Sequence, residues 1–318
     1  AFLSIVNHRP CHAGGMEIGS LQAFIRYIWQ INDPLSQISQ LSAQVQAAFA
    51  AMGRIFGMLE EEEEVPEKDP AADISAVKGN VCFEHVQFGY DDTLLMKDVN
   101  IEVKQGQMVA LVGPTGAGKT TIIKLLMRFY ELNSGTIYID GIPTTQMRRS
   151  DLRSLFGMVL QDTWLFEGTV AENIAYGCPD ATREQVIEAA KRAHAHKFIV
   201  QLPGGYDTVI GEDGGTFSQG QKQLLCIARV MLTDPAILLL DEATSSIDTR
   251  TELQVQAAFD ELMAGRTSFV VAHRLSTVRN ADCILVMRDG QIIERGTHDE
   301  LLAAGGFYAE LYRSQFAQ

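Results

Sequence analysis

The longest regular pattern in the chain is an apolar stripe between residues 18 and 59. Apolar residues recur there at every third or fourth position, with Ser and Gln opposite, a spacing that predicts an amphipathic helix. The stripe runs through Ile38, Leu41, Val45, Ala48, Met52, Ile55 and Leu59. We therefore expect one long helix, in which Pro34 removes a backbone donor and favours a kink.

The composition changes directly after this predicted helix. Glu60–Glu64 are consecutive acids, and prolines follow them closely. Because like charges repel and proline stops helices, residues 61–76 are predicted to form a solvated linker.

Beyond residue 77 the chain alternates between short strand patterns and helical patterns. Apolar runs predict strands at Val81–Phe88, Asn100–Lys104, Gln107–Val112, Ala236–Leu240, Thr267–Ala272 and Cys283–Arg288. Hairpins are predicted at Gly135–Asp140 and Gln291–Glu294. Helical spacing predicts helices at Thr121–Phe129, Ala181–Ile199, Lys222–Leu232 and Thr251–Met263, and one more at the C-terminus.

Length and charge narrow the classes of protein. The 318 residues suffice for one or two domains with a substantial core, and the net charge of -14 argues against non-specific nucleic-acid binding. No run of about 18 uncharged apolar residues occurs, so composition predicts no complete membrane span. Cys82, Cys226 and Cys283 lie in apolar runs and are expected to be buried free thiols, for which a reducing, cytosolic compartment is the simplest context.

The clearest chemical motif is a glycine-rich loop between a predicted strand and a predicted helix. It consists of Gly113, Pro114, Thr115, Gly116, Ala117, Gly118, Lys119 and Thr120, and it fits the P-loop pattern G-x-x-x-x-G-K-[ST]. Its backbone N–H groups and the helix N-terminus would bind a triphosphate, with Lys119 on the β- and γ-phosphates and Thr120 on Mg²⁺. A turn that binds nothing is the alternative, whereas a dinucleotide site needs G-x-G-x-x-G, which this loop lacks.

Two further segments carry chemistry. Ser218 and Gly220 form a second turn at the start of a helical pattern, which suits an anion but on its own also suits an ordinary helix cap. The aliphatic strand Ala236–Leu240 runs into Asp241 and Glu242. A strand of this kind is typically buried in a parallel sheet, and ligands bind at the carboxyl ends of such strands.

In this order, with His273 after the next apolar strand, the motifs resemble the ATPase domain of ATP-binding cassette (ABC) transporters. The resemblance runs from about Gly79 to the C-terminus and includes Tyr90, Gln161, the Gly211–Gly214 loop and Ser245–Asp248. Within the family, Gln161–Thr169 and Glu172–Ile174 are similar to the multidrug and lipid exporters.

The resemblance implies an α/β P-loop NTPase fold of the ABC type, spanning 77–318. Such a fold has a mixed central sheet with flanking helices, an antiparallel β subdomain and a helical subdomain, here about 162–230. Ile18–Ile31 and Ala51–Leu59 resemble parts of the last permease helix, so 1–60 is expected to be a remnant of that helix and its cytoplasmic extension. A soluble helix packed on a partner or on the ATPase domain is the alternative.

The resemblance also assigns roles in Mg²⁺-dependent ATP hydrolysis. Thr120, Asp241 and Gln161 would hold Mg²⁺, and Glu242 would activate the attacking water. His273 would contact the γ-phosphate, although a lone histidine after a strand is more often structural. Tyr90 would stack on adenine, with a half-buried strand-end tyrosine as the alternative. The expected ATP-binding residues are Tyr90, Gly113, Pro114, Thr115, Gly116, Ala117, Gly118, Lys119, Thr120 and Thr121.

A second ABC ATPase domain is the implied partner, with two ATP molecules held between the domains. Ser218, Gln219, Gly220 and Gln221 would face the partner's ATP, and Asp248 would cross to the partner. The family's common signature is Leu-Ser-Gly-Gly-Gln, so Phe217 and Gln219 depart from it. Because glutamine lacks the backbone freedom of glycine, Gln219 is expected to weaken this site in one half of a heterodimer, or to be tolerated in a homodimer.

The favoured function is therefore the motor domain of an ABC exporter for a drug or lipid, at the cytoplasmic face of the cell membrane beside its permease. A soluble ABC ATPase that is not coupled to transport is the alternative. A cassette that only binds nucleotide is disfavoured, because Lys119, Asp241, Glu242 and His273 are all present.

Overall fold

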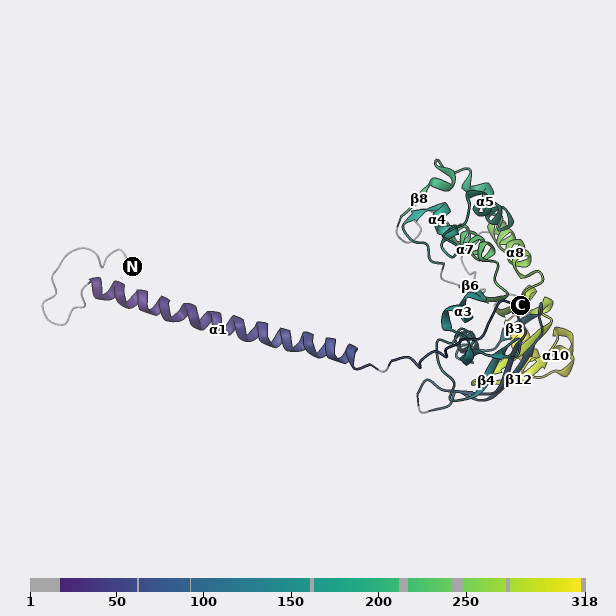
Figure 1. The fold of residues 1–318 in the computed structure, drawn as a ribbon, viewed down its shortest axis with the longest axis horizontal. Coiled ribbons are helices and arrows are strands. Elements are labelled where there is room, and N and C mark those ends of the chain that lie inside the picture. The colour runs from purple at the N-terminus through teal and green to yellow at the C-terminus, as the bar shows by residue number, and fades with distance from the viewer. Residues whose placement is uncertain are drawn as a thin grey trace. The chain divides into compact units, whose positions relative to one another are not determined.

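The computed structural model describes residues 18–61, 63–91, 93–160, 163–211, 217–241, 249–272 and 275–315. Two compact units divide the chain between Pro66 and Glu67 (Figure 1).

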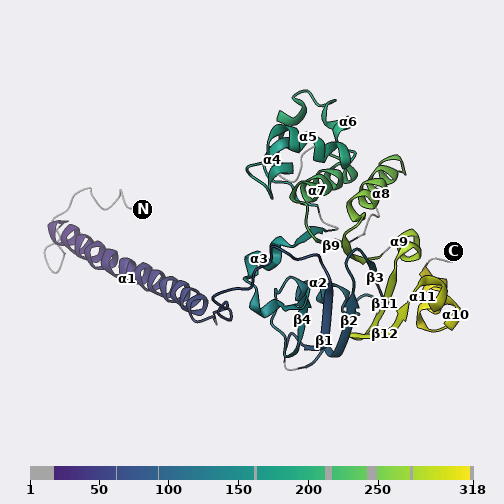
Figure 2. The same ribbon diagram turned by 45° about the vertical axis from the view of Figure 1, so that its right-hand side comes forward.

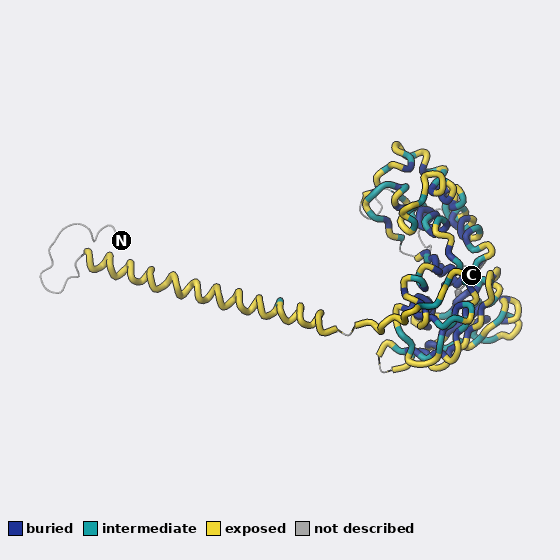
Figure 3. The backbone as a smooth tube through the Cα atoms, in the orientation of Figure 1, coloured by how far each residue is buried: buried dark blue, intermediate teal, exposed yellow. Residues whose placement is uncertain are grey.

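The described part of the first unit contains one long helix, α1 (Ile18–Leu59), with the bounds that the apolar stripe predicts. The helix continues through Pro34. Its large apolar side chains are exposed, including Trp29, Phe49 and Met58, and its tube is coloured as exposed almost throughout in Figure 3. Exposed apolar surface of this extent is typical of interaction sites. Within the described ranges, no helix has the length and apolarity needed to cross a membrane.

The second unit is built on two sheets (Figure 2). The larger sheet has the order β12 (Gln291–Gly296), β11 (Cys283–Arg288), β3 (Met108–Val112), β10 (Thr267–Val271), β9 (Ile237–Asp241), β6 (Phe156–Val159). Its strands pair in parallel except for the β11–β12 hairpin. The smaller antiparallel sheet has the order β2 (Met96–Val103), β1 (Val81–Phe88), β4 (Ser134–Ile139), β5 (Ile142–Pro143). A two-stranded ribbon joins β7 (Gly168–Thr169) to β8 (Val209–Ile210).

Helices cover the sheets in Figure 2. They are α2 (Lys119–Leu126), α3 (Arg149–Ser154), α4 (Val170–Ala175), α5 (Arg183–Arg192), α6 (His196–Ile199), α7 (Gln219–Thr233), α8 (Thr249–Met263), α9 (Leu275–Asn280), α10 (His298–Ala304) and α11 (Phe307–Gln315). Of these, α4, α5, α6, α7 and α8 form the region above β9 in Figure 2. Short 3₁₀ turns lie at Thr144–Gln146 and Gly205–Asp207.

The described residues form three apolar cores, and alternate side chains along the buried strands belong to different cores. Leu239 packs with α2 and the antiparallel sheet, whereas its neighbours Leu238 and Leu240 pack with α4, α5, α7 and α8. A third core joins β3 and β11 to the C-terminal helices. Because successive side chains of a strand point to opposite faces, one aliphatic strand can serve two cores.

Several predicted elements have different bounds. The helix predicted over Ala181–Ile199 is wrong, since α5 and α6 are separated at His194, whose φ of 56° is left-handed. The single C-terminal helix is also wrong, because Gly305 ends α10 at a φ of 65° and α11 follows. The second strand begins at Met96 instead of Asn100.

The predicted burial of cysteines holds only in part. Cys226 is buried, whereas Cys82 and Cys283 are half-buried, and all three are free thiols. Cys82 lies beside a cavity together with Glu84 and Glu102, and burial together with these two charges raises the pKa of its thiol.

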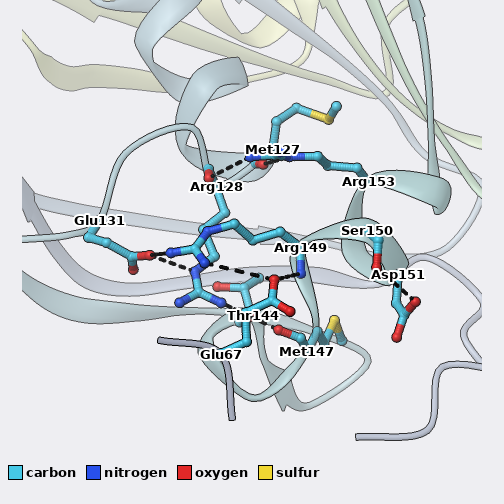
Figure 4. Close-up of polar contacts among 10 residues, drawn as sticks. All are labelled: Glu67, Met127, Arg128, Glu131, Thr144, Met147, Arg149, Ser150, Asp151 and Arg153. Atoms are coloured by element: carbon cyan, nitrogen blue, oxygen red, sulfur yellow. Dashed lines mark hydrogen bonds and ion pairs between the residues drawn. The ribbon is translucent and has the colours of Figure 1, made fainter. Parts of the chain in front are cut away.

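Within the second unit, charged side chains fasten its first residue, Glu67, to α3 (Figure 4). The carboxylate of Glu67 accepts a hydrogen bond from the Arg149 backbone N–H at 2.8 Å. The Arg149 guanidinium lies 2.9 Å from Glu131, and so does the guanidinium of Arg128. Both arginines are buried. A buried cation that loses its partners is costly, so these contacts hold the chain on α3.

We expect Glu67→Ala to lower the free energy of unfolding of the second unit by about 1 kcal/mol, because the Arg149 amide loses its acceptor. Urea unfolding measures this loss. Glu63→Ala, which removes the same charge from the exposed linker, is the control. Equal stabilities for the two variants would contradict the proposed anchor.

Candidate nucleotide-binding site

The parallel strands of the larger sheet bring distant residues to one edge. Val271 on β10 pairs with Leu111 on β3 and with Asp241 on β9, so these three residues are level in the sheet. The glycine-rich loop leaves β3 one residue further on, after Val112. This is the carboxyl edge of the strands, where ligands bind in open α/β sheets.

Glycine is required at two positions of this loop. Gly118 directly precedes α2 with a φ of 101°, a conformation that other residues rarely adopt. A Cβ atom at Gly113 would overlap the backbone carbonyl of Met287. At Gly116, in contrast, a Cβ atom would have no neighbour within 4 Å, so this part of the loop faces open space. The loop therefore presents backbone to a cavity, as a phosphate cradle must.

Lys119 bends back over the loop. Its Nζ donates to the carbonyl oxygens of Gly113 at 2.6 Å and Pro114 at 3.0 Å. Burial lowers the pKa of the Lys119 ammonium, and the charge of Asp241 partly opposes this shift. Because a charged phosphate oxygen is a stronger acceptor than a neutral carbonyl, the ammonium is poised to exchange these carbonyls for phosphate.

A cavity of about 410 Å³ joins these groups. It is lined by Tyr90, Leu95, Thr115, Gly116, Ala117, Gly118, Lys119, Thr120, Thr121, Asp241 and Val271. The structure thus brings together most of the ATP-binding residues expected from the sequence, and it places Asp241 with them. A larger cavity, of about 830 Å³, lies on β1 and β2, but Glu84 and Glu102 in its wall disfavour a polyphosphate.

The lining residues fit Mg-ATP by their chemistry. The Lys119 ammonium and the loop amides suit phosphate oxygens, and the Thr120 hydroxyl and Asp241 carboxylate are hard oxygen ligands of the kind that Mg²⁺ binds. In the described ranges, no group of three or more His, Cys, Asp or Glu side chains could hold a metal by itself. Mg²⁺ usually takes one or two protein carboxylates, while phosphates and waters complete its shell.

Tyr90 follows the end of β1 and is held by its hydroxyl, which lies 3.1 Å from that of Thr121. Its ring meets the rings of Phe88 and Tyr130 edge to face, at centroid distances of 4.9 Å and 5.1 Å. The Lys124 ammonium lies 5.7 Å from the Tyr90 ring centroid. Tyr90 is 48% exposed and lines the cavity, and its stacking on adenine stays a prediction. Local sequence patterns did not indicate the neighbouring residues Lys124 and Tyr130.

The second predicted phosphate turn is a capping box. The backbone N–H of Ser218 donates to Gln221 Oε1 at 3.0 Å, and Ser218 Oγ accepts from the Gln221 N–H at 3.3 Å. This role of Gln221 was not expected from the sequence, although the pattern Ser-x-x-Gln signals a capping box. As an acceptor in this bond, the Ser218 hydroxyl keeps its hydrogen for another oxygen.

The Ser218 turn does not share the cavity of the glycine-rich loop. The described residues that line that cavity include none of Ser218, Gln219, Gly220 or Gln221. Gln219 instead donates from Nε2 to the Thr163 hydroxyl at 3.2 Å.

Four predicted site residues, Gln161, Glu242, Asp248 and His273, lie outside the described residues, as do Glu212–Gly214. In the sequence, Gln161 follows β6, Glu242 follows β9 and His273 follows β10. Those three strands are parallel neighbours and end at the edge that bears Asp241. The roles assigned to these residues therefore stay predictions.

Three features together define a P-loop nucleoside triphosphatase fold. They are the parallel strand β3, the glycine-rich loop whose lysine begins α2, and an aspartate on β9 that is level with the end of β3. Comparison with known proteins narrows this class. Residues 96–245 match the ABC transporter family. The chain is 53% identical, over 302 residues, to a "Fatty acid ABC transporter ATP-binding/permease protein" of Mycobacterium bovis, covering 95% of this chain and 48% of that protein.

A second relative is an "ATP-dependent lipid A-core flippase" of Syntrophus aciditrophicus, 41% identical over 305 residues, with 96% of this chain and 51% of that protein covered. The structure of a bacterial Atm1-family ABC exporter with ATP bound superimposes with a TM-score of 0.77 at 39% identity, over 97% of this chain and 54% of that one. The chain belongs to the ABC transporter family, and the ABC-type fold expected from the sequence is confirmed. It spans about half the length of these relatives.

We expect Tyr90→Ala to weaken ATP binding by about 5- to 150-fold, the effect of losing about 1–3 kcal/mol of base stacking. Tyr90→Phe keeps the ring but loses the contact with Thr121, so its loss should be smaller. Equilibrium titration with a fluorescent ATP analogue measures both effects. Tyr27→Ala, which removes an exposed tyrosine of α1, should bind like the unmodified chain. Equal affinities for Tyr90→Ala and Tyr27→Ala would exclude stacking.

Proposed function

We propose that this chain is the ATP-binding and ATP-hydrolysing motor part of an ABC exporter. The observation that carries the proposal is the single cavity that holds the glycine-rich loop, Lys119, Thr120 and Asp241. The charges of Lys119 and Asp241 interact across this cavity. Phosphoryl transfer depends mostly on positioning and charge stabilisation, and these are the properties that this arrangement supplies.

Each group of residues has a role in the proposed hydrolysis. The loop amides and Lys119 stabilise negative charge on the β- and γ-phosphates. Thr120, Asp241 and Gln161 hold Mg²⁺, which when bound neutralises phosphate charge. Glu242 orients and deprotonates the attacking water, and His273 contacts the γ-phosphate. Tyr90 supports the adenine ring, aided by Tyr130 and Lys124.

The proposed active form is a dimer of ATPase domains. The Ser218 hydroxyl and the backbone of Gln219 and Gly220 would face the ATP held by Lys119 of the partner, with Asp248 crossing between the domains. The separation of the Ser218 turn from its own loop cavity supports this arrangement. Both a homodimer and a heterodimer fit the geometry of one chain.

The exposed apolar side of α1 supports association with a permease. Two relatives, a fatty acid ABC transporter ATP-binding/permease protein and a lipid A-core flippase, are transporters of about twice the length spanned here. The exposed side of α1 and the similarity to these transporters favour an exporter over a soluble ABC ATPase. We infer that the ATPase domain works at the cytoplasmic face of the cell membrane, and that the substrate is amphipathic, with a lipid favoured over a drug.

Glu242→Gln is expected to bind Mg-ATP normally and to hydrolyse it about 10²–10⁴ times more slowly, because the amide cannot accept a proton from water. Lys119→Ala should instead lose ATP binding as well. Phosphate release and equilibrium binding, measured on both variants, separate the two roles. If Glu242→Gln hydrolysed ATP at the rate of the unmodified chain, Glu242 would not be the base that activates water.

In the Glu242→Gln background, saturating Mg-ATP should convert the chain to dimers, because ATP forms part of the interface. Light scattering with and without nucleotide measures the mass. Ser218→Ala in the same background should shift the transition to higher protein concentration. A chain that binds Mg-ATP and stays monomeric at high protein concentration would contradict the proposed dimer.

A further inference from the structure

The segment Thr163–Phe166 lies along one face of α7. Gln219 Nε2 donates to the Thr163 hydroxyl at 3.2 Å, and the Cys226 thiol lies 4.0 Å from the Trp164 carbonyl oxygen. Arg229 also donates to this carbonyl, at 3.4 Å. With 3.6 residues per turn, the seven positions from Gln219 to Cys226 span nearly two full turns, so both side chains lie on the same side of the helix.

The other end of the segment is held by a buried asparagine. The Asn173 side chain accepts from the Phe166 N–H at 3.1 Å and donates to the Phe166 carbonyl at 3.0 Å. The backbone carbonyl of Asn173 in turn accepts from Arg229 Nε at 2.9 Å. Helices α4 and α7 pack against each other (Figure 2). At its Phe166 end the segment is therefore fixed to both helices, whereas at Thr163 the hydrogen bond from Gln219 ties it to the first residue of α7.

Gln219 stands where the family's common signature, Leu-Ser-Gly-Gly-Gln, has its first glycine. The change adds a polar side chain at this position. That side chain donates a hydrogen bond to Thr163 of its own chain. A glycine there has no side chain and cannot make this contact. The departure that the sequence analysis expected to weaken the partner site therefore has a structural use within the chain.

We propose that Gln219 is a positioning residue that ties the partner-facing turn at Ser218 to the segment Thr163–Phe166. The proposal rests on the proposed function of the Ser218 turn. Thr163 stands two residues after Gln161 in the sequence, the predicted neighbour of the chain's own ATP. The link thus connects the turn that contacts the partner's nucleotide with the loop that serves the chain's own nucleotide.

The consequence is communication between the two nucleotide sites of the dimer. A displacement of the Ser218 turn by the partner's ATP moves Gln219, and the hydrogen bond passes this displacement to Thr163. The next residue, Trp164, is 56% exposed, so the same displacement reaches the surface. Gln219 acts through Thr163 and does not itself take part in the chemistry.

Hydrogen–deuterium exchange of the nucleotide-free chain tests the link without any need for hydrolysis. Gln219→Ala and Thr163→Val should each speed exchange of the amides of residues 163–166 by about 2- to 10-fold, the effect of one modest hydrogen bond. The double variant should be no faster than either single variant, because both remove the same bond. Thr163→Ser keeps the hydroxyl and should behave like the unmodified chain, as should Gln201→Ala, which removes an exposed glutamine elsewhere in the helical region.

Exchange that is unchanged in Gln219→Ala, or effects of the two single variants that add fully in the double variant, would overturn the proposal. Urea unfolding of each variant shows whether faster exchange reflects global destabilisation, which would also count against the link.

Steady-state ATP hydrolysis provides a second test of the link between Gln219 and Thr163. The dependence of rate on ATP concentration should lose cooperativity in Gln219→Ala and in Thr163→Val. In Thr163→Val, which changes none of the proposed ATP-binding residues, kcat at saturating ATP should also change less than about 3-fold. Gln219→Gly should behave like Gln219→Ala. Turnover above that of the unmodified chain in Gln219→Gly would show that the glutamine obstructs the partner site, and would overturn the proposal. Absence of hydrolysis in the unmodified chain would refute the proposed function alone, since the exchange arm would still test the link.

Discussion

The site depends on the parallel pairing of β3 with β10 and of β10 with β9. Parallel strands end at the same edge of a sheet, so this pairing brings Asp241 to the edge where the glycine-rich loop begins. A shift of β9 by one residue would turn Asp241 to the other face of the sheet and would separate it from Lys119. The aliphatic side chains of β9 oppose such a shift, since they are fully buried in two different cores.

Burial of this sheet on both faces gives the loop a rigid base. Leu111 and Val271 pack toward α2 and the antiparallel sheet, while Ala110 and Val112 pack toward the C-terminal helices. The close approach of Gly113 to the Met287 carbonyl fixes the exit of β3. A phosphate cradle needs backbone groups that are already in place, because ordering them upon binding would weaken affinity.

Polar side chains join the cores to the surface. Glu131 pairs with the buried Arg128 and Arg149, and Arg149 in turn holds Glu67. Asn173 holds the segment beside α7. Buried polar groups of this kind are satisfied by several partners. Removal of one partner leaves a buried donor or acceptor without a hydrogen bond, which lowers the stability of the fold. They form the fixed points to which the linker and the segment Thr163–Phe166 are attached.

The sequence by itself determined the features that depend on neighbours in the chain. The bounds of α1, the strands β1 and β11 and the glycine-rich loop follow from local periodicity and composition. Local patterns missed the break at His194, because a left-handed residue other than glycine has no clear signal. Only the tertiary structure decided the contacts between distant segments, such as Gln219 with Thr163, Tyr90 with Thr121 and Glu67 with Arg149. Each of these contacts depends on how sheets and helices pack, and packing depends on the whole set of buried side chains.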